Sequence, residues 1–296
     1  MAAERMQLTE PDYGSFIDPK LIRRMSRIIR MGVATAMDAL KQAGLAQPSA
    51  ILVGTAYGCL DDTGVFLKKM VEQEEEMLTP TSFIQSTHNT VGAQIALLLK
   101  CHSYNNTYVQ GVFSFESALL DTWLLLQENP AQQVLAGSAE ELTTYSFEIL
   151  KRFGMYRHRM ASEGAAFFVA GGERNDKTLA ECRAVSLFYA GNSTALSDRM
   201  VQLAAQTGRP PQLLLTAAPE IFPDPLPAGF GPAFPFKDAC GEYPTATGFA
   251  TWLAIALLQE NRWPEWLGAG EDSPACIWVH QYDGQGKHSF IVLQAC

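Results

Sequence analysis

Two uninterrupted apolar runs constrain the fold of this chain more than any other feature. AILVGTA at residues 50–56 and LLLTAA at residues 213–218 carry no charged side chain. A strand that is apolar on both faces must be covered on both faces, and this is typical of a parallel sheet between layers of helices. The two runs therefore predict an α/β protein with largely parallel sheets.

The elements around each run follow a similar order, so the chain reads as an approximate structural repeat. Each half has an apolar strand, a glycine-marked entry to an Ala/Leu-rich helix, a short strand that ends near a turn, and a closing strand. Two such halves packed together predict a five-layer α-β-α-β-α fold. We place the halves at residues 1–172 and 173–296, the second being shortened. Helices are expected at 22–44, 63–73, from 86, from 114, at 193–205 and at 245–260, and further strands at 107–109, 132–137, from 161, at 181–190, at 275–280 and from 288.

Composition and charge narrow the class of protein. The net charge of −9 gives no general attraction to nucleic acid or to anionic lipid. The most apolar run, residues 250–258, is too short to span a bilayer. The N-terminus shows no signal-peptide pattern of basic residues followed by an apolar segment. The six cysteines are scattered without CxxC spacing, which indicates neither a zinc site nor a disulfide framework. We expect a cytoplasmic protein without a metal or other cofactor.

The stretch TYVQGVFSFESALLDTWLLL, residues 107–126, changes from a β-rich run into a helical one. Gly111 permits an unusual backbone angle at the change, and Ser114 with Glu116 suits the first turn of a helix. In many α/β enzymes such a junction carries a nucleophile, because the helix N-terminus offers free N–H groups to a developing anion. Here the junction reads Gly-Val-Phe-Ser, with no strong nucleophile at its centre.

Two charged clusters have a structural and a functional interpretation. The first helix is surrounded by arginines, which predict either a solvated face or a docking patch for an acidic carrier protein. The acidic run EQEEEM at residues 72–77 is interpreted as a solvated helix end in preference to a metal site. The arginines of the first cluster are Arg23, Arg24, Arg27 and Arg30.

Taken together, these motifs resemble the β-ketoacyl synthase branch of the thiolase superfamily. QQVLAGSAEEL and SEGAAFFVA resemble two strands of the family, the second with its Glu-Gly-Ala at residues 163–165. KDACGEYPTATGFATWLAIALL resembles the family's Lys-x-x-x-Gly-His segment, with Lys237 and Gly241 in register. The family places a cysteine at the strand-to-helix elbow, and counting back from Ala118 puts Val112 at that position.

The residues that the resemblance assigns to chemistry are replaced. Val112 cannot be acylated, Glu242 stands where the second family histidine would follow the glycine, and TAAPEIFPDP carries no histidine in the loop of the first. Of the glycines in the family's oxyanion turn, Gly286 is retained and Gly284 is one place off. Condensation needs a thiolate, two neutral imidazoles and backbone donors, so we expect no catalytic residue.

Other reactive side chains are interpreted mainly as structural residues. Cys59 and Cys240 are expected to be small buried hydrophobes, and His88 a capping or packing residue. His280 and His288 flank a turn and could share a metal only if they faced each other across a hairpin. Ser114 lies at the elbow with a capping role and is the fallback nucleophile.

The resemblance is closest to the catalytically silent ketosynthase homologues called chain-length factors, and in particular to the ketosynthase-like proteins of aryl polyene and flexirubin-type clusters. RRMSR, GTAYGCL and FIQSTHNT, which begin at Arg23, Gly54 and Phe83, carry this similarity. It implies a non-catalytic subunit that pairs with an active ketosynthase, or with itself, in fatty acid or polyketide-type chain elongation, with an acyl carrier protein as a possible partner.

The same resemblance assigns structural roles around the elbow. Val112, Phe113 and Phe115 would form the floor of a substrate tunnel. In the family the elbow strands of two subunits pair antiparallel, so the dimer seam is expected along the run that precedes the elbow. The seam residues are Thr107, Tyr108, Val109, Gln110 and Gly111.

Two alternatives remain open at this stage. One is a working ketosynthase, acyltransferase or hydrolase that uses Ser114 or a displaced base. The other is a self-pairing protein that binds an acyl chain or coenzyme A without chemistry.

Overall fold

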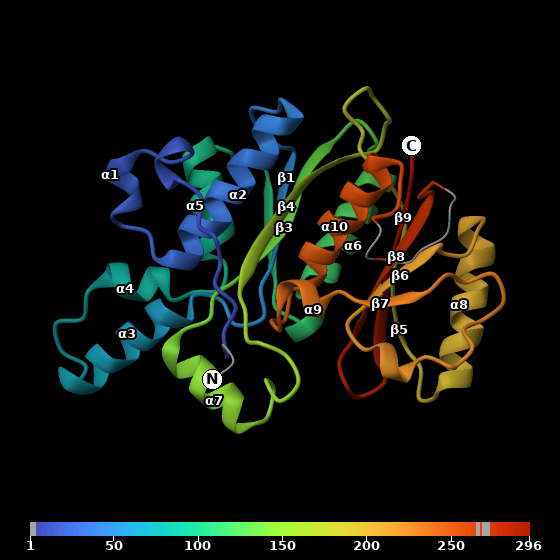
Figure 1. The fold of residues 1–296 in the computed structure, drawn as a ribbon. Helices are drawn as coiled ribbons and strands as arrows, with labels where there is room; N and C mark the ends of the chain where they lie inside the picture. The colour runs from blue at the N-terminus through green and yellow to red at the C-terminus, as the bar shows by residue number, and fades with distance from the viewer. Residues whose placement is uncertain (1–3, 265–266, 268–272) are drawn as a thin grey trace. The chain divides into compact units, whose positions relative to one another are not determined.

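Two sheets organise the chain in a computed structural model, which describes residues 4–264, 267 and 273–296 (Figure 1). The chain divides into two compact units. Unit 1 contains residues 1–173 and 241–248, and unit 2 contains residues 174–240 and 249–296. The short segment 241–248 thus folds with unit 1 although it follows most of unit 2 in the sequence. That the halves 1–172 and 173–296 are both ketosynthase-like stays a prediction.

The sheet of unit 1 is mixed, with four strands among the described residues in the order β2-β1-β3-β4. β1 pairs parallel with β2 and β3, whereas β4 runs antiparallel to β3. The strands of unit 1 are β1 (Ala50–Gly54), β2 (Tyr104–Tyr108), β3 (Gln133–Glu140) and β4 (Gly164–Gly171).

The helices of unit 1 cover both faces of this sheet. Figure 1 shows α2 and α5 on one side and α6 on the other. The core under α2 is aliphatic and includes Ile28, Ile29, Ile51 and Leu135, each at most 1% exposed. The helical segments of unit 1 are η1 (Tyr13–Ser15), α1 (Pro19–Ile22), α2 (Arg27–Ala43), α3 (Leu60–Glu72), α4 (Pro80–Gln85), α5 (Thr90–Leu99), η2 (Gly111–Phe113), α6 (Ser114–Glu128) and α7 (Thr144–Arg152).

The sheet of unit 2 has five strands among the described residues, in the order β5-β9-β8-β6-β7. β6 pairs parallel with β7 and β8, and β9 runs antiparallel to both β8 and β5. The strands of unit 2 are β5 (Glu181–Tyr189), β6 (Leu213–Thr216), β7 (Ala233–Pro235), β8 (Cys276–Tyr282) and β9 (Lys287–Gln294).

An aromatic core fills unit 2. Trp278 lies edge-on to Phe230 and Phe290, and it packs with apolar side chains of α8 such as Met200. Figure 1 shows α8 and α10 on opposite sides of this sheet. The helical segments are α8 (Ser193–Thr207), η3 (Pro219–Ile221), α9 (Lys237–Cys240) and α10 (Thr247–Glu260), the first two residues of which belong to unit 1.

The two uninterrupted apolar runs do form buried parallel strands, β1 and β6, with every residue buried. The prediction of largely parallel sheets is too simple, since each sheet carries antiparallel pairing at one side. β4 and β5 have mixed burial patterns that the apolar runs do not predict.

Several helix boundaries differ from the predicted ones. The first helix closes at Gly44, in the left-handed region with φ of 70°, as expected, but it starts at Arg27 because Ser26 is its N-cap. The helix expected from Ser86 starts at Thr90, and α4 before it was not predicted. α7, which begins after a capping box formed by Thr143 and Ser146, was not predicted either. No helix in the described part of the chain is long and apolar enough to cross a membrane.

Candidate functional site

The elbow between β2 and α6 is built as the sequence predicts. Gly111 adopts φ of 59° and starts the one-turn segment η2, after which α6 begins at Ser114. The elbow lies against the end of β1, where a Cβ atom on Gly54 would come within 2.4 Å of the carbonyl oxygen of Ser114. Only glycine allows this approach, so β1 fixes the position of the elbow.

The side chains at the elbow are apolar and tightly packed. Val112 is half-buried, Phe113 is 5% exposed and Phe115 is fully buried. The Phe115 ring packs against Phe168 of β4, with ring centroids 5.9 Å apart. This packing supplies bulk at the predicted tunnel floor and no group that accepts an acyl chain.

The hydroxyl of Ser114 is fully buried and bonded to backbone groups of the elbow. It donates to the Gly111 carbonyl at 2.8 Å and accepts from the Gln110 N–H at 2.9 Å. The N-cap of α6 is Phe113, so Ser114 closes the preceding turn and does not cap the helix as expected. A serine acting as nucleophile needs its proton directed at a base, whereas this proton points to a carbonyl oxygen.

A buried carboxyl group lies at the carboxyl end of β3, close to the end of β1. Glu140 is 1% exposed, accepts a short hydrogen bond from the Ala56 N–H, and has no partner for its Oε2 among the described residues. Burial raises the pKa of Glu140 to about 8. Burial likewise raises the pKa of the neighbouring Glu141 to about 7, and this carboxylate accepts from the Asp61 N–H at 2.9 Å. At neutral pH Glu140 is therefore mainly a neutral acid.

Glu242, which the motif resemblance assigns to a family histidine position, belongs to unit 1. Its backbone N–H donates to the Met160 carbonyl at 2.8 Å, and its carbonyl accepts from the Ser162 N–H at 3.1 Å. Its carboxylate lies 3.8 Å from the Arg159 guanidinium. The two side chains form an ion pair within unit 1.

Two tyrosines lie near these acids. Burial, followed by the charges of Glu140 and Glu242, raises the pKa of Tyr57. Burial raises the pKa of Tyr156 to about 12, with smaller contributions from Tyr57 and Glu242. The site therefore offers neutral phenols and the neutral Glu140 carboxyl group, which can donate hydrogen bonds but are poor nucleophiles.

Sequence reasoning missed Glu140, Tyr57, Tyr156 and Arg159 as members of this cluster. The sequence did contain a signal for two of them. Tyr57 follows the apolar run of β1, and Glu140 is the last residue of β3. Because these parallel strands end at the same edge of the sheet, the two residues are expected to lie close together. No local pattern brings Arg159 to a residue of the 241–248 segment.

The arginines predicted around the first helix are neither wholly solvated nor wholly free for docking, and Arg23 and Arg24 lie before α2, which begins at Arg27. Arg27 binds the carboxylates of Glu10 and Glu163, and these hydrogen bonds raise the pKa of its guanidinium against the effect of burial. Arg30 lies over the Tyr13 ring at 5.6 Å. Arg23 and Arg24 are exposed, so the outward-facing part of the cluster is these two residues.

The histidines predicted to flank a turn face each other inside unit 2. The His280 Nε2 lies 3.1 Å from the His288 Nδ1, across the β8–β9 hairpin. At the two ends, the His280 Nδ1 lies 2.9 Å from the Thr216 hydroxyl and the His288 Nε2 lies 3.3 Å from the Ala190 carbonyl oxygen. Since a carbonyl only accepts, His288 donates from Nε2, and the His280 Nε2–H must donate to His288.

Burial lowers the pKa of both imidazoles, for His280 well below its usual 6.5. The pair is thus a neutral hydrogen-bonded chain across the hairpin. No group of three or more metal-ligating side chains occurs among the described residues.

The remaining reactive side chains of the sequence analysis are packed. Cys59 and Cys240 are buried, and burial raises the pKa of the Cys59 thiol. The His88 ring packs on Gly58, where a Cβ atom would come within 2.8 Å of it. Lys237 is 6% exposed and lies in unit 2.

The seam predicted before the elbow lies at the edge of the unit 1 sheet. Thr107 and Tyr108 belong to β2, the last strand of the order, and Val109 and Gln110 are exposed. The Tyr108 hydroxyl donates to Asp121 at 2.8 Å, which ties the strand to α6. The outer edge of β2 pairs with no other described strand.

An α/β protein with two mixed sheets and a glycine-marked strand-to-helix elbow is the class that this geometry defines. The N-terminal domain of beta-ketoacyl synthases matches residues 2–152, half of the chain. The chain belongs to the beta-ketoacyl synthase family, and the resemblance inferred from the motifs is confirmed. A search of curated protein sequences found no match.

Solved structures confirm the fold at low sequence identity. A structure of AntDE:AntF, a type II PKS acyl-carrier protein with its ketosynthase bound to the hexaketide, is 15% identical with a TM-score of 0.79, over 98% of this chain and 89% of that chain. The ishigamide ketosynthase/chain length factor is 16% identical with a TM-score of 0.75, over 97% and 87%. The ketosynthase ApeO in complex with its chain length factor ApeC, from Xenorhabdus doucetiae, is 13% identical with a TM-score of 0.71, over 95% and 84%.

Proposed function

We propose that this protein is a non-catalytic ketosynthase-like subunit that pairs with an active ketosynthase in polyketide or fatty acid-type chain elongation. The observation that carries the proposal is the elbow. Val112 falls where the motif resemblance expects the acyl-accepting cysteine, and the hydroxyl of Ser114 is buried and donates to a backbone carbonyl. No acyl-enzyme can form there without rearrangement of the elbow.

The surroundings of the elbow support the same conclusion. Condensation needs neutral imidazoles beside the forming enolate, and the motif resemblance puts Glu242, which pairs with Arg159, at the position of one of them. The two imidazoles that share a cluster, His280 and His288, use their ring nitrogens on each other and on their own unit. The acid-base groups needed for condensation are therefore replaced or occupied.

The partner role rests on the seam and on the relatives. The free edge of β2 offers backbone groups for antiparallel pairing with a second subunit along Thr107–Gly111. Two of the similar structures are described as a ketosynthase with a chain length factor, and another contains an acyl-carrier protein. In a shared tunnel, Phe113 and Phe115 would limit the length of the growing chain, with the carrier protein delivering it to the active subunit.

An elongation assay with the ketosynthase encoded beside this chain tests the proposal. This chain alone should give no product, and its addition should increase the turnover of the ketosynthase or change its product length. The variant Val109→Pro, at the exposed seam, should lose the effect, because proline lacks the N–H that pairing needs. The control variant is Val201→Ser, at an exposed site of unit 2. Proline is not used at this position because it would break α8. Product formation by this chain alone, or indifference of the ketosynthase to it, would refute the proposal.

A further inference from the structure

The end of α7 and the turn that follows it form an exposed surface of mixed apolar and basic side chains. Residues 151–160, KRFGMYRHRM, make up this surface, which we call the basic tip. Phe153 is 80% exposed, Met155 is 47% exposed and Met160 is 39% exposed. Ile149, one helical turn before Phe153, is 52% exposed. Large apolar side chains clustered at the surface in this way are typical of a binding surface.

The charge of the basic tip is opposite to that of the whole chain. Residues 151–160 contain four Lys and Arg residues, one His and no acid, whereas the net charge of the chain is −9. Lys151 binds both carboxylate oxygens of Glu4, at 2.8 and 2.7 Å, and Arg159 lies 3.8 Å from Glu242. The members of the tip that form no ion pair with a described residue are Arg152, Arg157 and His158.

An open cavity of about 400 Å³ lies beside the basic tip. Two aromatic rings form part of its wall, Phe147 of α7 and Tyr156, and they stack with centroids 5.5 Å apart. Glu4, the partner of Lys151, also lines the cavity. The basic side chains in the wall are Lys151, Arg157, His158 and Arg159. Such a wall suits a phosphate group, which accepts several charge-assisted hydrogen bonds at once.

A glycine turn holds one cation of the tip close to Phe153. Gly154 has φ of 83°, in the left-handed region, and a Cβ atom on it would lie 2.6 Å from the Arg157 Nε. The Arg157 side chain therefore lies over the backbone of the turn, at the residue that follows Phe153. The fold thus keeps an exposed guanidinium near an exposed apolar ring, where one ligand surface can meet both.

We propose that the basic tip binds the surface of a membrane that contains anionic phospholipid. Lipid phosphates lie against Arg152 and Arg157 and at the mouth of the cavity, and Phe153 with Met155 enters the boundary between headgroups and acyl chains. Because the chain as a whole is acidic, this attraction comes from a local surface and orients the bound protein. The inference does not depend on the proposed function.

A membrane fits the tip better than an acidic protein does. The carboxylates of a protein would pair with the cations but would leave Phe153 and Met155 in water unless that protein also supplied an apolar pocket. A membrane interface supplies phosphate and acyl chain within the reach of one long side chain. Each exposed cation near such a surface strengthens binding about fivefold at low salt, so binding through this tip is reversible.

Sedimentation with vesicles tests the proposal. Wild-type protein should sediment with vesicles of phosphatidylglycerol and phosphatidylcholine in equal parts, and its partition coefficient should be about tenfold lower for phosphatidylcholine alone. The double variant Arg152→Ala, Arg157→Ala removes two exposed cations and should lower binding to the anionic vesicles about tenfold or more at low salt. Phe153→Ser should lower binding at low and at high salt alike, because its contribution is apolar.

A tryptophan at the tip reports insertion directly. Brominated phosphatidylcholine in the anionic vesicles should quench the fluorescence of Phe153→Trp more than that of the wild-type protein. Val201→Trp, at an exposed site of α8 in unit 2, is the matched control and should add no quenching. Since both sites are exposed, neither change repacks the core.

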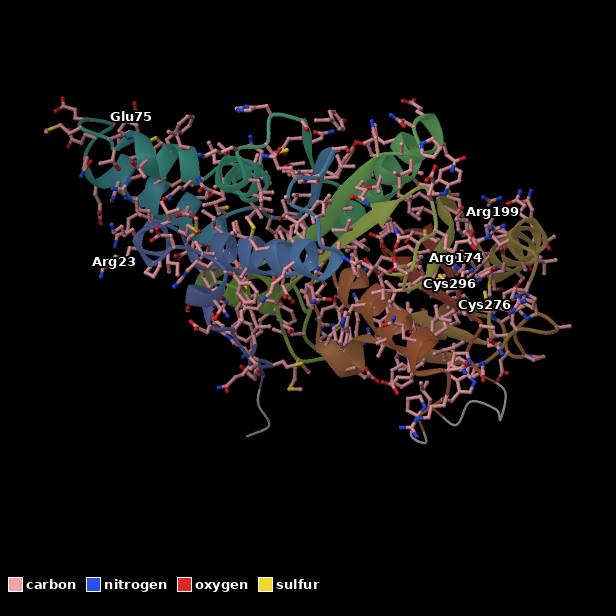
Figure 2. The ribbon with its side chains drawn as sticks, turned by 90° about the horizontal axis from the view of Figure 1, so that it is seen from above. Arg23, Glu75, Arg174, Arg199, Cys276 and Cys296 are labelled. Carbon is pink, nitrogen blue, oxygen red and sulfur yellow. The ribbon has the colours of Figure 1, made fainter. Side chains whose placement is uncertain are left out.

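Matched controls for the vesicle assay also lie in unit 2. Arg174→Ala removes an exposed arginine, labelled in Figure 2, and should bind the anionic vesicles as the wild-type protein does. Val201→Ser removes an exposed apolar side chain and should likewise leave binding unchanged. All the variants should keep the circular dichroism spectrum of the wild-type protein, because the altered side chains are exposed.

Three results would overturn the proposal. The first is a wild-type protein that stays in the supernatant with anionic vesicles at low salt. The second is wild-type binding by both the double arginine variant and Phe153→Ser. The third is binding of the tip to polyglutamate but not to vesicles, which would assign this surface to an acidic protein.

Discussion

The two units bury polar clusters at the same place in their sheets but with opposite chemistry. In unit 1 the cluster lies where β1 and β3 end, and it is acidic, with Glu140 held by the Ala56 N–H. In unit 2 it lies where β6 and β8 end, and it is basic, with His280 and His288 between Thr216 and the Ala190 carbonyl.

Burial neutralises both clusters, by proton uptake in one and by proton loss in the other. It raises the pKa of Glu140 to about 8 and lowers the pKa of His280 and His288 below 6.5. Each cluster then satisfies its hydrogen bonds mainly within its own unit. The comparison shows that the two sheets keep titratable groups at the ends of their parallel strands and that burial favours the neutral form in both.

The largest effect that tests this contrast is a pH dependence of opposite sign in the two units. Between about pH 4.5 and 8 the unfolded chain has lost the Glu140 proton that the folded chain keeps, so the stability of unit 1 should fall as pH rises, by a few kcal/mol over the window. Below about pH 6.5 the unfolded chain takes up protons that the folded histidines refuse, so the stability of unit 2 should fall as pH falls. Hydrogen exchange of peptides from each unit, followed by mass spectrometry, measures both.

The variant Glu140→Gln sharpens this test, because glutamine keeps an oxygen for the Ala56 N–H and cannot titrate. It should remove the Glu140 contribution to the pH dependence of unit 1, leaving the smaller one of Glu141, and leave that of unit 2 as it is. The same pH dependence in both units, or an undiminished dependence of unit 1 in the variant, would contradict the assignment.

A smaller effect is expected when the imidazole chain is cut. His288→Leu leaves the His280 Nε2–H buried without an acceptor, which should lower the free energy of unfolding by about 2 kcal/mol at neutral pH. Urea titration monitored by tryptophan fluorescence measures this loss, since Trp278 lies in the core of unit 2. The variant should also lose part of the acid sensitivity of unit 2. A variant as stable as wild type would show that the chain of hydrogen bonds contributes nothing.

The smallest expected effect is at the elbow. Ser114→Ala removes a hydroxyl that bonds the Gln110 N–H and the Gly111 carbonyl, and the unit 1 stability should fall by about 1 kcal/mol. Ser197→Ala, whose hydroxyl bonds the Ser193 carbonyl on α8, is the matched control and should cost less because that site is partly solvated. A decrease in the unit 1 stability much larger than about 1 kcal/mol would mean that Ser114 does more than stabilise the turn.

The sequence was sufficient for the parts of the fold that follow from local pattern. Apolar runs predicted β1 and β6, a glycine predicted the end of α2, and the change of pattern near Gly111 predicted the elbow. The antiparallel direction of β4 and β9 could not be predicted from the sequence, because strand direction depends on chain connections and not on local composition.

The candidate site was less predictable for the same reason. Val112 and Glu242 could be named from the family motifs, whereas the raised pKa of Glu140 depends on burial that only the packed sheet creates. The pairing of Arg159 with Glu242 joins residues far apart in the sequence, and no pattern indicates that residues 241–248 fold with unit 1. The sequence around Arg27 predicted a solvated face or a docking patch. The two acids that bind Arg27, Glu10 and Glu163, come from other elements, so no local pattern indicates these ion pairs.

The measurement that tests the central claim most directly is the intact mass of this protein after incubation with a labelled acyl thioester. An active ketosynthase treated in parallel should gain the mass of the acyl group. This chain should keep its unmodified mass, because Val112 offers no nucleophile and Ser114 directs its proton to a carbonyl. A stable adduct mapped to Ser114, or to any of the six cysteines, would contradict the account.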